Sequence, residues 1–185
     1  MTLVLVGAGG HAKTIVEMMT ANGTPFTAYA DPQPADWLDL PQVAEDAIPE
    51  GAAFVVGIGG VTPAALRGRL GVLDALCARG LAARDAIHPS AIVSASAALA
   101  AGAVVLAGAV IQPGAVIGRG AIVNTGAIVE HDSVVGEGAH IAPGAIVLGG
   151  CRIGACALIG AGAVVLPGGK VAPDALVPAL SRAAA

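Results

Sequence analysis

The second half of the chain carries a repeat of six residues that runs from Ile87 to Val177. An aliphatic residue recurs at every sixth position, and a small residue, usually Ala, stands four positions after each of the first fifteen. A period of six fits neither an α-helix nor an ordinary strand, and such fixed self-similarity is typical of a solenoid. The sixteen aliphatic positions are Ile87, Val93, Leu99, Val105, Ile111, Ile117, Val123, Val129, Val135, Ile141, Val147, Ile153, Ile159, Val165, Val171 and Val177.

Each hexad predicts a short strand followed by a tight turn, and three hexads close one triangular coil. Large aliphatic side chains then point inward, and small residues lie where the wall bends sharply. Five coils result from sixteen hexads, with side chains 18 residues apart stacked at one strand spacing, about 4.8 Å. The alternative, an unstructured Ala/Gly/Val tract, does not explain sixteen repeats in register.

The first half has a different pattern, which predicts a small, mostly parallel, Rossmann-like α/β unit with three layers. We expect strands over residues 3–6, 26–30 and 53–58, a helix over 12–21, and a second helix over 63–78 that Gly80 caps. The predicted domains are therefore residues 1–84 for the α/β unit, 85–178 for the solenoid and 179–185 for a short tail.

Composition excludes several classes of protein. The net charge is −4 and the chain has only two lysines, which argues against binding to nucleic acid. The three cysteines have no spacing typical of a metal or redox motif, which favours a reducing compartment, and we expect a cytoplasmic protein. The start of the chain lacks a basic segment before its short apolar run, and no apolar run is long enough to span a membrane.

A glycine-rich loop follows the first predicted strand. Gly7, Gly9 and Ala12 match the pattern G-x-G-x-x-G/A at the start of a helix, and Asp31 ends the next strand. Such a loop lets the backbone and the helix N-terminus approach a phosphate, and the acidic residue can hold a ribose or base. Three strands make only half of a dinucleotide-binding domain, so we expect a single nucleoside diphosphate. A glycine-rich turn without any ligand is the alternative.

The repeat is chemically plain except around His131. Asn124, Glu130, Asp132 and His140 lie within two or three hexads of it, whereas His88 stands at the start of the solenoid and is expected to cap its edge. A histidine beside a carboxylate suits a general base, and the alternative is a solvated histidine in a turn.

Gly149 lies 18 residues after His131, which is one coil further on. Its backbone N–H is expected about one strand spacing from the imidazole, where it could donate to a developing oxyanion. His131 and His140 are nine residues apart, or half a coil, so we expect no metal site from them within one chain.

Three segments together resemble the bacterial sugar O/N-acetyltransferases of the NeuD and PglD type. They are residues 6–11 (VGAGGH), 87–91 (IHPSA) and 123–132 (VNTGAIVEHD), and the likeness covers residues 1 to about 170. The resemblance implies a left-handed β-helix, a homotrimer with active sites between subunits, and transfer of acetyl from acetyl-CoA to an amine or hydroxyl of a nucleotide-linked sugar. A UDP- or GDP-linked 4-amino-4,6-dideoxyhexose is the substrate class it suggests.

The resemblance also implies roles for individual residues. His131 matches the catalytic base, Asp132 the acid that supports it, and Gly149 the backbone donor. Asn124 matches a polar active-site residue. Contacts to the nucleotide sugar are implied for Gly9, Gly10, His11, Asp31 and Gly59, and contacts to acetyl-CoA for His140, Gly149, Ala161 and Ala179.

Two departures from the family pattern bear on these roles. The chain ends soon after Val177-Pro178-Ala179-Leu180, where the family continues in a glycine-rich coil that wraps acetyl-CoA, and Gly60 stands where the family usually has Asn. The leading hypothesis is an N-acetyltransferase that acts on a nucleotide-linked amino sugar. O-acetylation of a sialic acid or another sugar, and a non-catalytic trimeric scaffold or nucleotide-sugar sensor, are the competing ones.

Overall fold

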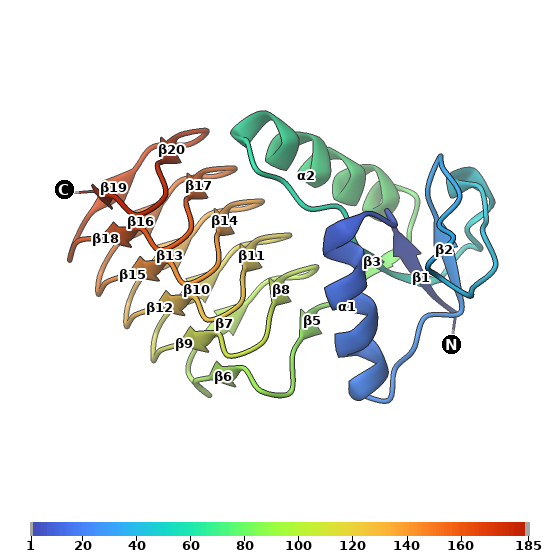
Figure 1. Ribbon diagram of the computed structural model, residues 1–185, viewed down its shortest axis with the longest axis horizontal. Helices are drawn as coiled ribbons and strands as arrows, with labels where there is room; N and C mark the ends of the chain where they lie inside the picture. The colour runs from blue at the N-terminus through green and yellow to red at the C-terminus, as the bar shows by residue number, and fades with distance from the viewer. Residues whose placement is uncertain (1, 184–185) are drawn as a thin grey trace.

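The computed structural model describes residues 2–183 as a small α/β unit joined to a parallel β-solenoid (Figure 1). The α/β unit contains strands β1 (Leu3–Val6), β2 (Ala28–Ala30), β3 (Ala53–Val56) and β4 (Ala82–Ala83), helices α1 (Gly10–Ala21) and α2 (Pro63–Ala78), and a short 3-10 helix (Glu45–Ala47). All four strands are parallel, in the order β2-β1-β3-β4. The first predicted strand is confirmed with its predicted bounds, the other two are confirmed in shorter form, and β4 was not predicted.

The sheet is buried on both faces, which explains its uninterrupted apolar strands. Leu5 and Val55 point toward α1, whereas their neighbours Val4 and Phe54 point toward α2. The three predicted layers are therefore present. The predicted ends of α2 are also confirmed, because Thr62 caps its first turn and Gly80 has a φ of +81° just past its end.

The solenoid consists of two-residue strands that form three parallel sheets, each strand pairing with the one 18 residues away. The β5 sheet contains β5 (Ala86–Ile87), β8 (Val104–Val105), β11 (Ile122–Val123), β14 (His140–Ile141), β17 (Leu158–Ile159) and β20 (Leu176–Val177). The β6 sheet contains β6 (Ile92–Val93), β9 (Val110–Ile111), β12 (Ile128–Val129), β15 (Ile146–Val147), β18 (Val164–Val165) and β21 (Arg182–Ala183). The β7 sheet contains β7 (Ala98–Leu99), β10 (Val116–Ile117), β13 (Val134–Val135), β16 (Arg152–Ile153) and β19 (Lys170–Val171).

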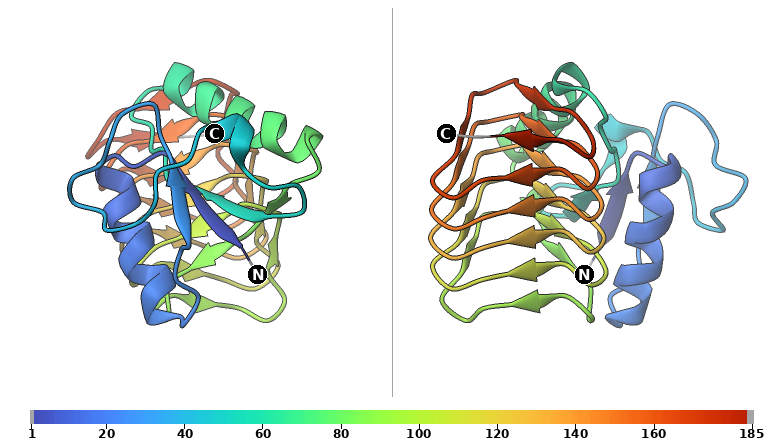
Figure 2. Two further views of the ribbon diagram at one scale, coloured as in Figure 1. Left: turned by 90° about the vertical axis from the view of Figure 1, so that its right-hand side faces the viewer. Right: turned by 60° about the vertical axis from the view of Figure 1, so that its left-hand side comes forward.

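Both predicted positions of the hexad face inward. The coils stack in one column (Figure 2). Inside this column the aliphatic residues and the small residues form one continuous core. The last strand, β21, pairs with β18 and Ala183 packs on the core, so the solenoid extends past the predicted boundary at residue 178.

Four-residue turns form the three corners of each coil. The first corner, between the β5 and β6 sheets, includes residues 124–127; the second, between the β6 and β7 sheets, includes 130–133; the third, between the β7 and β5 sheets, includes 118–121. From residue 102 to residue 180 the third residue of every turn has a positive φ, and ten of these fourteen residues are Gly. Only Asp132, Cys156, Asp174 and Leu180 adopt this conformation without being glycine.

The α/β unit packs on the outer face of the β5 sheet. Ile122 contacts the apolar cluster around α1, and Leu158 contacts Leu66 of α2. Helix α2 also runs along the third corner of successive coils (Figure 1), where Leu73 fills the space beside Gly102 and Gly120. In residues 2–183, no helix has the length and apolar character required to cross a membrane.

Candidate active site

An open cavity of about 580 Å³ lies at the carboxyl ends of β1 and β3. The structure brings together there all five residues predicted to contact a nucleotide sugar. Its lining residues are Gly7, Gly9, Gly10, His11, Asp31, Gly57, Ile58, Gly59, Gly60, Val61 and Ala65. This is the edge of a parallel sheet at which ligands of open α/β folds bind.

The glycines of this cavity have two different reasons to be glycine. Gly7 has a φ of +89°, and a Cβ on Gly57 would lie 2.5 Å from the carbonyl oxygen of Gly7, so these two residues allow the loops to approach each other. A Cβ on Gly9 or Gly10 would meet nothing within 4 Å. Gly9 caps α1, so the open space lies in front of the free N–H groups of a helix N-terminus, which favour an anionic group.

Asp31 holds the glycine loop in place. Its carboxylate accepts hydrogen bonds from the N–H groups of Ala8 and Gln33, both at 2.8 Å. Trp37, which the sequence did not single out, donates from Nε1 to the carbonyl of Ala8 at 3.0 Å, and Lys13 lies over its ring at 5.4 Å. Asp31 thus supports the loop as well as lining the cavity.

A hydrogen-bonded chain joins the first corner to the floor of this cavity. Thr125 N–H donates to Asn124 Oδ1 at 2.7 Å, and the Asn124 amide lies 2.9 Å from Nε2 of His140. On the other side of the ring, His140 Nδ1 lies 2.8 Å from the carbonyl oxygen of Gly60. A carbonyl only accepts, so Nδ1 carries the proton and Nε2 accepts from Asn124.

Two buried imidazoles lie in this region. Burial, and then the nearby Arg69 and His140, lower the pKa of His11 from 6.5 to about 4. Burial also lowers the pKa of His140, with Arg69 adding to the effect, although the bond to Gly60 opposes it. Both rings are therefore uncharged near neutral pH.

The second corner places His131, Asp132 and Gly149 together. Nδ1 of His131 lies 2.9 Å from Oδ2 of Asp132, and the side chains are 64% and 74% exposed. A Cβ built on Gly149 would lie 2.6 Å from Nε2 of His131, so the imidazole lies directly over this residue. Among residues 2–183 the Gly149 N–H has no hydrogen-bond acceptor.

Asp132 has a backbone conformation that a glycine would adopt more easily. Its φ is +60°, at the turn position that Gly114 and Gly150 occupy one coil before and after it. Asp tolerates this conformation better than most residues, but still at a cost of order 1 kcal/mol. The replacement of glycine by Asp132 at this repeat position is visible in the sequence.

The predicted site residues thus fall in two places within one chain. Asn124 lies at the first corner, and His140 lies beside it on the β5 sheet, next to the cavity. His131 lies at the second corner, one side of the triangle away. Ala161 and Ala179 stack at the first corner, where the N–H of Leu180 donates to the carbonyl of Ala161. His140 uses both ring nitrogens within the chain and is buried.

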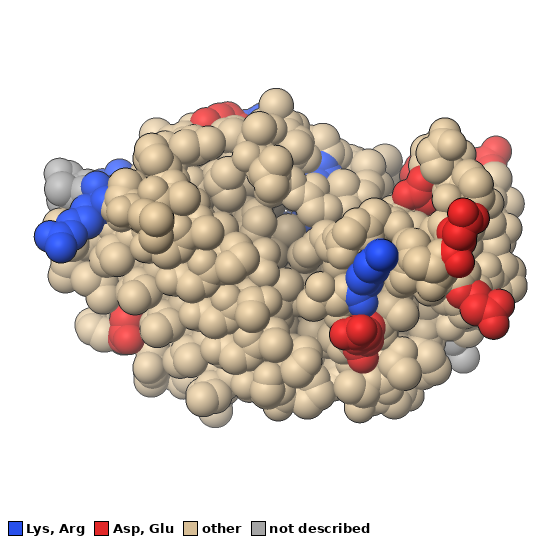
Figure 3. All heavy atoms as spheres, viewed as in Figure 1, with Lys and Arg blue, Asp and Glu red and all other residues tan. Residues whose placement is uncertain are grey.

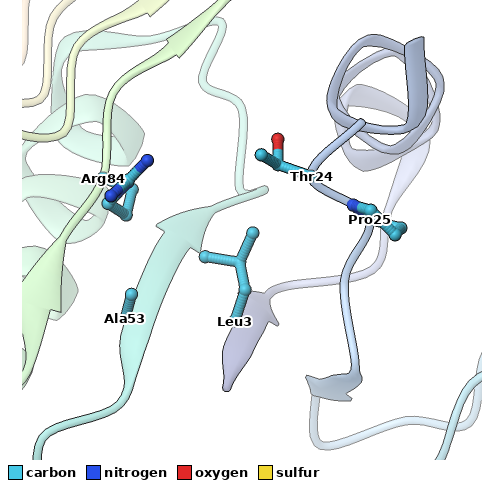
Figure 4. Close-up of a pocket in the computed structure, with 5 residues that line it drawn as sticks. All are labelled: Leu3, Thr24, Pro25, Ala53 and Arg84. Atoms are coloured by element: carbon cyan, nitrogen blue, oxygen red, sulfur yellow. The ribbon is translucent and has the colours of Figure 1, made fainter. Parts of the chain in front are cut away.

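Two further observations delimit the site. No group of three His, Cys, Asp or Glu side chains that could hold a metal ion occurs in the described part of the chain. A smaller cavity of about 120 Å³ lies at the opposite end of the sheet, lined by Leu3, Thr24, Pro25, Ala53 and Arg84 (Figure 4). None of the predicted site residues lies there.

Known proteins share this fold. The family of bacterial transferase hexapeptide repeats matches residues 132–167. PerB from Caulobacter crescentus, solved in complex with CoA and GDP-perosamine, is 34% identical, with a TM-score of 0.89 over 97% of this chain and 86% of that one. The acetyltransferase domain of PglB from Neisseria gonorrhoeae, solved with acetyl coenzyme A, is 32% identical, with a TM-score of 0.88 over 99% and 92% of the two chains. No curated protein sequence matches the chain significantly.

The chain therefore belongs to the sugar acetyltransferases of the hexapeptide-repeat, left-handed β-helix superfamily. This confirms the predicted class of enzyme and the predicted solenoid.

Proposed function

We propose that this protein transfers the acetyl group of acetyl-CoA to the amine of a nucleotide-linked amino sugar. The observation that carries the proposal is the His131–Asp132 pair above Gly149, on a chain that resembles a perosamine N-acetyltransferase over almost its whole length. We interpret residues 1–84 as a Rossmann-like domain that binds the nucleotide sugar, with the diphosphate at the N-terminus of α1. The cysteines Cys77, Cys151 and Cys156 are free thiols, which suits a reducing compartment, and we place the enzyme in the cytoplasm.

In the proposed reaction the sugar amine attacks the thioester carbonyl directly. A bond forms between the amine nitrogen and the carbonyl carbon, Nε2 of His131 takes the proton, and the C–S bond then breaks to release CoA, whose thiolate can recover that proton. Asp132 holds Nδ1 and so keeps Nε2 free to accept. No cysteine is needed as a nucleophile, since Cys151 and Cys156 are buried and burial raises the pKa of each thiol.

The Gly149 N–H is the proposed oxyanion donor. Gly149 lies directly beside the His131 imidazole, and its N–H has no other acceptor in residues 2–183, so it can bind the oxygen that becomes negative as the amine attacks. Residue 149 has to be glycine because the His131 imidazole occupies the place of a side chain. Its backbone conformation does not require glycine, since of residues 149 and 150 only Gly150 has a positive φ.

A homotrimer would bring the two parts of the site together. His131 is exposed and one side of the triangle away from the cavity, so a second copy has to supply either the base or the sugar. The outer face of the β6 sheet offers an interface, because its outward residues in five successive strands are apolar and only partly buried or exposed. They are Ile92, Val110, Ile128, Ile146 and Val164.

The β7 sheet differs, because its outward positions include Arg152 and Lys170. Charged side chains are also sparse over the part of the solenoid that Figure 3 shows. Sedimentation equilibrium should therefore give three times the chain mass of 17.7 kDa. The substitution Val110→Glu should dissociate the trimer, whereas Val116→Glu on the β7 sheet should not, and the reverse pattern would contradict this interface.

Acetyl-CoA is proposed to lie along the first corner of a neighbouring subunit, beside Ala161 and Ala179. Leu180 ends this column with a positive φ of 59° and is 87% exposed. A large apolar side chain in this strained and exposed position is consistent with a surface that another molecule covers. Leu180 thus presents an apolar side chain where acetyl-CoA is expected.

A thiol-release assay with acetyl-CoA and a panel of UDP- and GDP-linked 4-amino sugars tests the function. We expect release of CoA thiol that depends on one of these acceptors, and a product whose mass shows one added acetyl group. If the corresponding hydroxyl sugars are acetylated and the amino sugars are not, the acceptor is a hydroxyl group and not an amine. Absence of both thiol release and CoA binding would favour a scaffold.

A further inference from the structure

Arg69 is the largest side chain in the protein that is fully buried, with 1% of its surface exposed. Within residues 2–183 no carboxylate pairs with it, and burial lowers its pKa to about 10. Burying a cation without a counter-ion costs several kcal/mol, and an apolar residue of similar length would pack there at lower cost. Packing alone therefore does not explain an arginine at this position.

The partners of Arg69 are two backbone carbonyls from different parts of the molecule. Its Nε donates to the carbonyl of Ile58 at 2.8 Å, and its Nη1 donates to the carbonyl of Gly120. Ile58 lies in the loop between β3 and α2 that lines the large cavity, and Gly120 lies in the third corner of the solenoid. The guanidinium thus connects the cavity loop to the solenoid.

His140 makes a second connection to the same loop, through the carbonyl of Gly60 at 2.8 Å. Between these two donors the loop is closely packed. A Cβ on Gly59 would lie 3.1 Å from the Cβ of His11, and a Cβ on Gly60 would lie 2.6 Å from Leu66. The position of residues 58–60, and with it one wall of the cavity, therefore depends on donors that lie outside the loop.

Two buried nitrogen atoms in this region have no partner in the described chain: Nη2 of Arg69 and Nε2 of His11. The charged and titratable groups that face the two imidazoles are Arg69 and each other, and Cys156 faces Arg69 from the third corner. The arginine therefore acts on the cavity floor both through its hydrogen bonds and through its charge.

We propose that Arg69 is a positioning residue that fixes the loop of residues 58–60 against the solenoid and so sets the shape of the nucleotide-sugar cavity. This inference rests on the proposed function for the identity of the ligand. Arg69 does not contact the substrate in this proposal, because its Nε and Nη1 donate to backbone carbonyls and its Nη2 is buried.

The test compares Arg69→Met, Arg69→Lys and the control Arg67→Met. Arg67 lies on the same helix and forms an exposed ion pair with Asp174, but it does not contact the loop. For Arg69→Met we expect the KM of the nucleotide sugar to rise about tenfold or more, with the KM of acetyl-CoA within about twofold of wild type. Arg69→Lys keeps the charge but reaches only one carbonyl, and should be intermediate. Arg67→Met should match wild type.

Calorimetric binding of UDP and GDP, without turnover, separates this inference from the proposed function. If the wild type binds a nucleotide but acetylates no sugar, the proposed function fails, and weaker nucleotide binding by Arg69→Met would still support the role of Arg69. If the wild type acetylates a sugar and both substrate KM values are unchanged in Arg69→Met, the inference is wrong.

A spectroscopic readout does not depend on any ligand or on turnover. The chain has four histidines, so the ¹⁵N imidazole signals of His140 can be assigned by substitution. The wild type should show the proton on Nδ1, and Arg69→Lys, the milder variant, should show this tautomer partly lost as the loop shifts. If Arg69→Met does not fold, an unchanged His140 signal together with an unchanged sugar KM in Arg69→Lys would overturn the proposal.

Discussion

The second and third corners of the solenoid have the same turn but different surroundings. At the third corner, helix α2 covers successive coils, and the side chains there pack or form ion pairs, such as Arg67 with Asp174 and Arg119 with Asp74. At the second corner no element of residues 2–183 covers His131 or Asp132, and both side chains are exposed. One repeat therefore supplies both a covered structural edge and an open edge, at which we propose that the reaction takes place.

The largest effect is expected for His131→Ala at the second corner. Loss of the proposed base should lower kcat about 10³-fold, within the range for general bases, while the thermal unfolding temperature changes little because the side chain is exposed. His88→Ala, at the edge of the solenoid, is the matched control and should keep its activity. Equal kcat values for the two variants would remove His131 from the mechanism.

At the third corner the opposite result is expected. Leu73→Ala leaves a cavity between α2 and the glycine turns, and should lower the free energy of unfolding by about 3 kcal/mol. Urea denaturation measures this change, and kcat at a temperature where the variant is folded should stay within about threefold of wild type. A loss of kcat as large as that of His131→Ala would mean that the two corners are not functionally distinct.

Gly149 and Gly150 sharpen the comparison within a single turn. The Cβ of Gly149→Ala displaces the imidazole, and should lower kcat about 10²-fold with little change in stability. Gly150→Ala places alanine at a φ of +70°, and should cost about 1 kcal/mol of stability with activity retained. If Gly149→Ala instead lowers stability and keeps its activity, residue 149 matters for the fold rather than for the reaction.

The smallest effect concerns acid stability at the junction between the α/β unit and the solenoid. An unfolded chain protonates His11 near pH 6.5, whereas in the folded protein its pKa is about 4. Below pH 6.5 the unfolded state therefore binds more protons, and the free energy of unfolding should fall by about 1.4 kcal/mol per pH unit for each such histidine. Urea midpoints at pH 7, 6 and 5 measure this slope, which His11→Asn should reduce. A slope that His11→Asn leaves unchanged would contradict the buried, uncharged state of His11.

Strong periodicity made the solenoid predictable, because every hexad repeats the same local requirement and sixteen of them agree. The glycine loop was predictable because its pattern lies between a strand and a helix that are close in sequence, although only Gly7 is fixed by a positive φ and by contact with Ile58 of the neighbouring loop. The strand β4 was missed because its two alanines carry no pattern, and β21 because Arg182 and Ala183 depart from the repeat.

The remaining parts of the site depend on contacts between distant segments. Arg69 lies on a helix whose sequence gives no sign that one arginine is buried and another exposed. The half-coil spacing of His131 and His140 already predicts different faces of the triangle for these two residues, whereas the hydrogen bond between Asn124 and His140 appears only in the folded structure. Only the folded structure shows that His131 and the nucleotide-sugar cavity lie apart within one chain.

The central claim is that the active site is shared between subunits, and mixed trimers test it most directly. One subunit would carry His131→Ala, and the other Gly59→Val, which fills the floor of the cavity beside His11. Each homotrimer alone should be inactive. If a site takes its cavity from one subunit and His131 from the next, random mixing should restore about one quarter of the wild-type activity. No recovery in mixed trimers whose composition is confirmed by native mass spectrometry would contradict the account, because it would place the complete site within one chain.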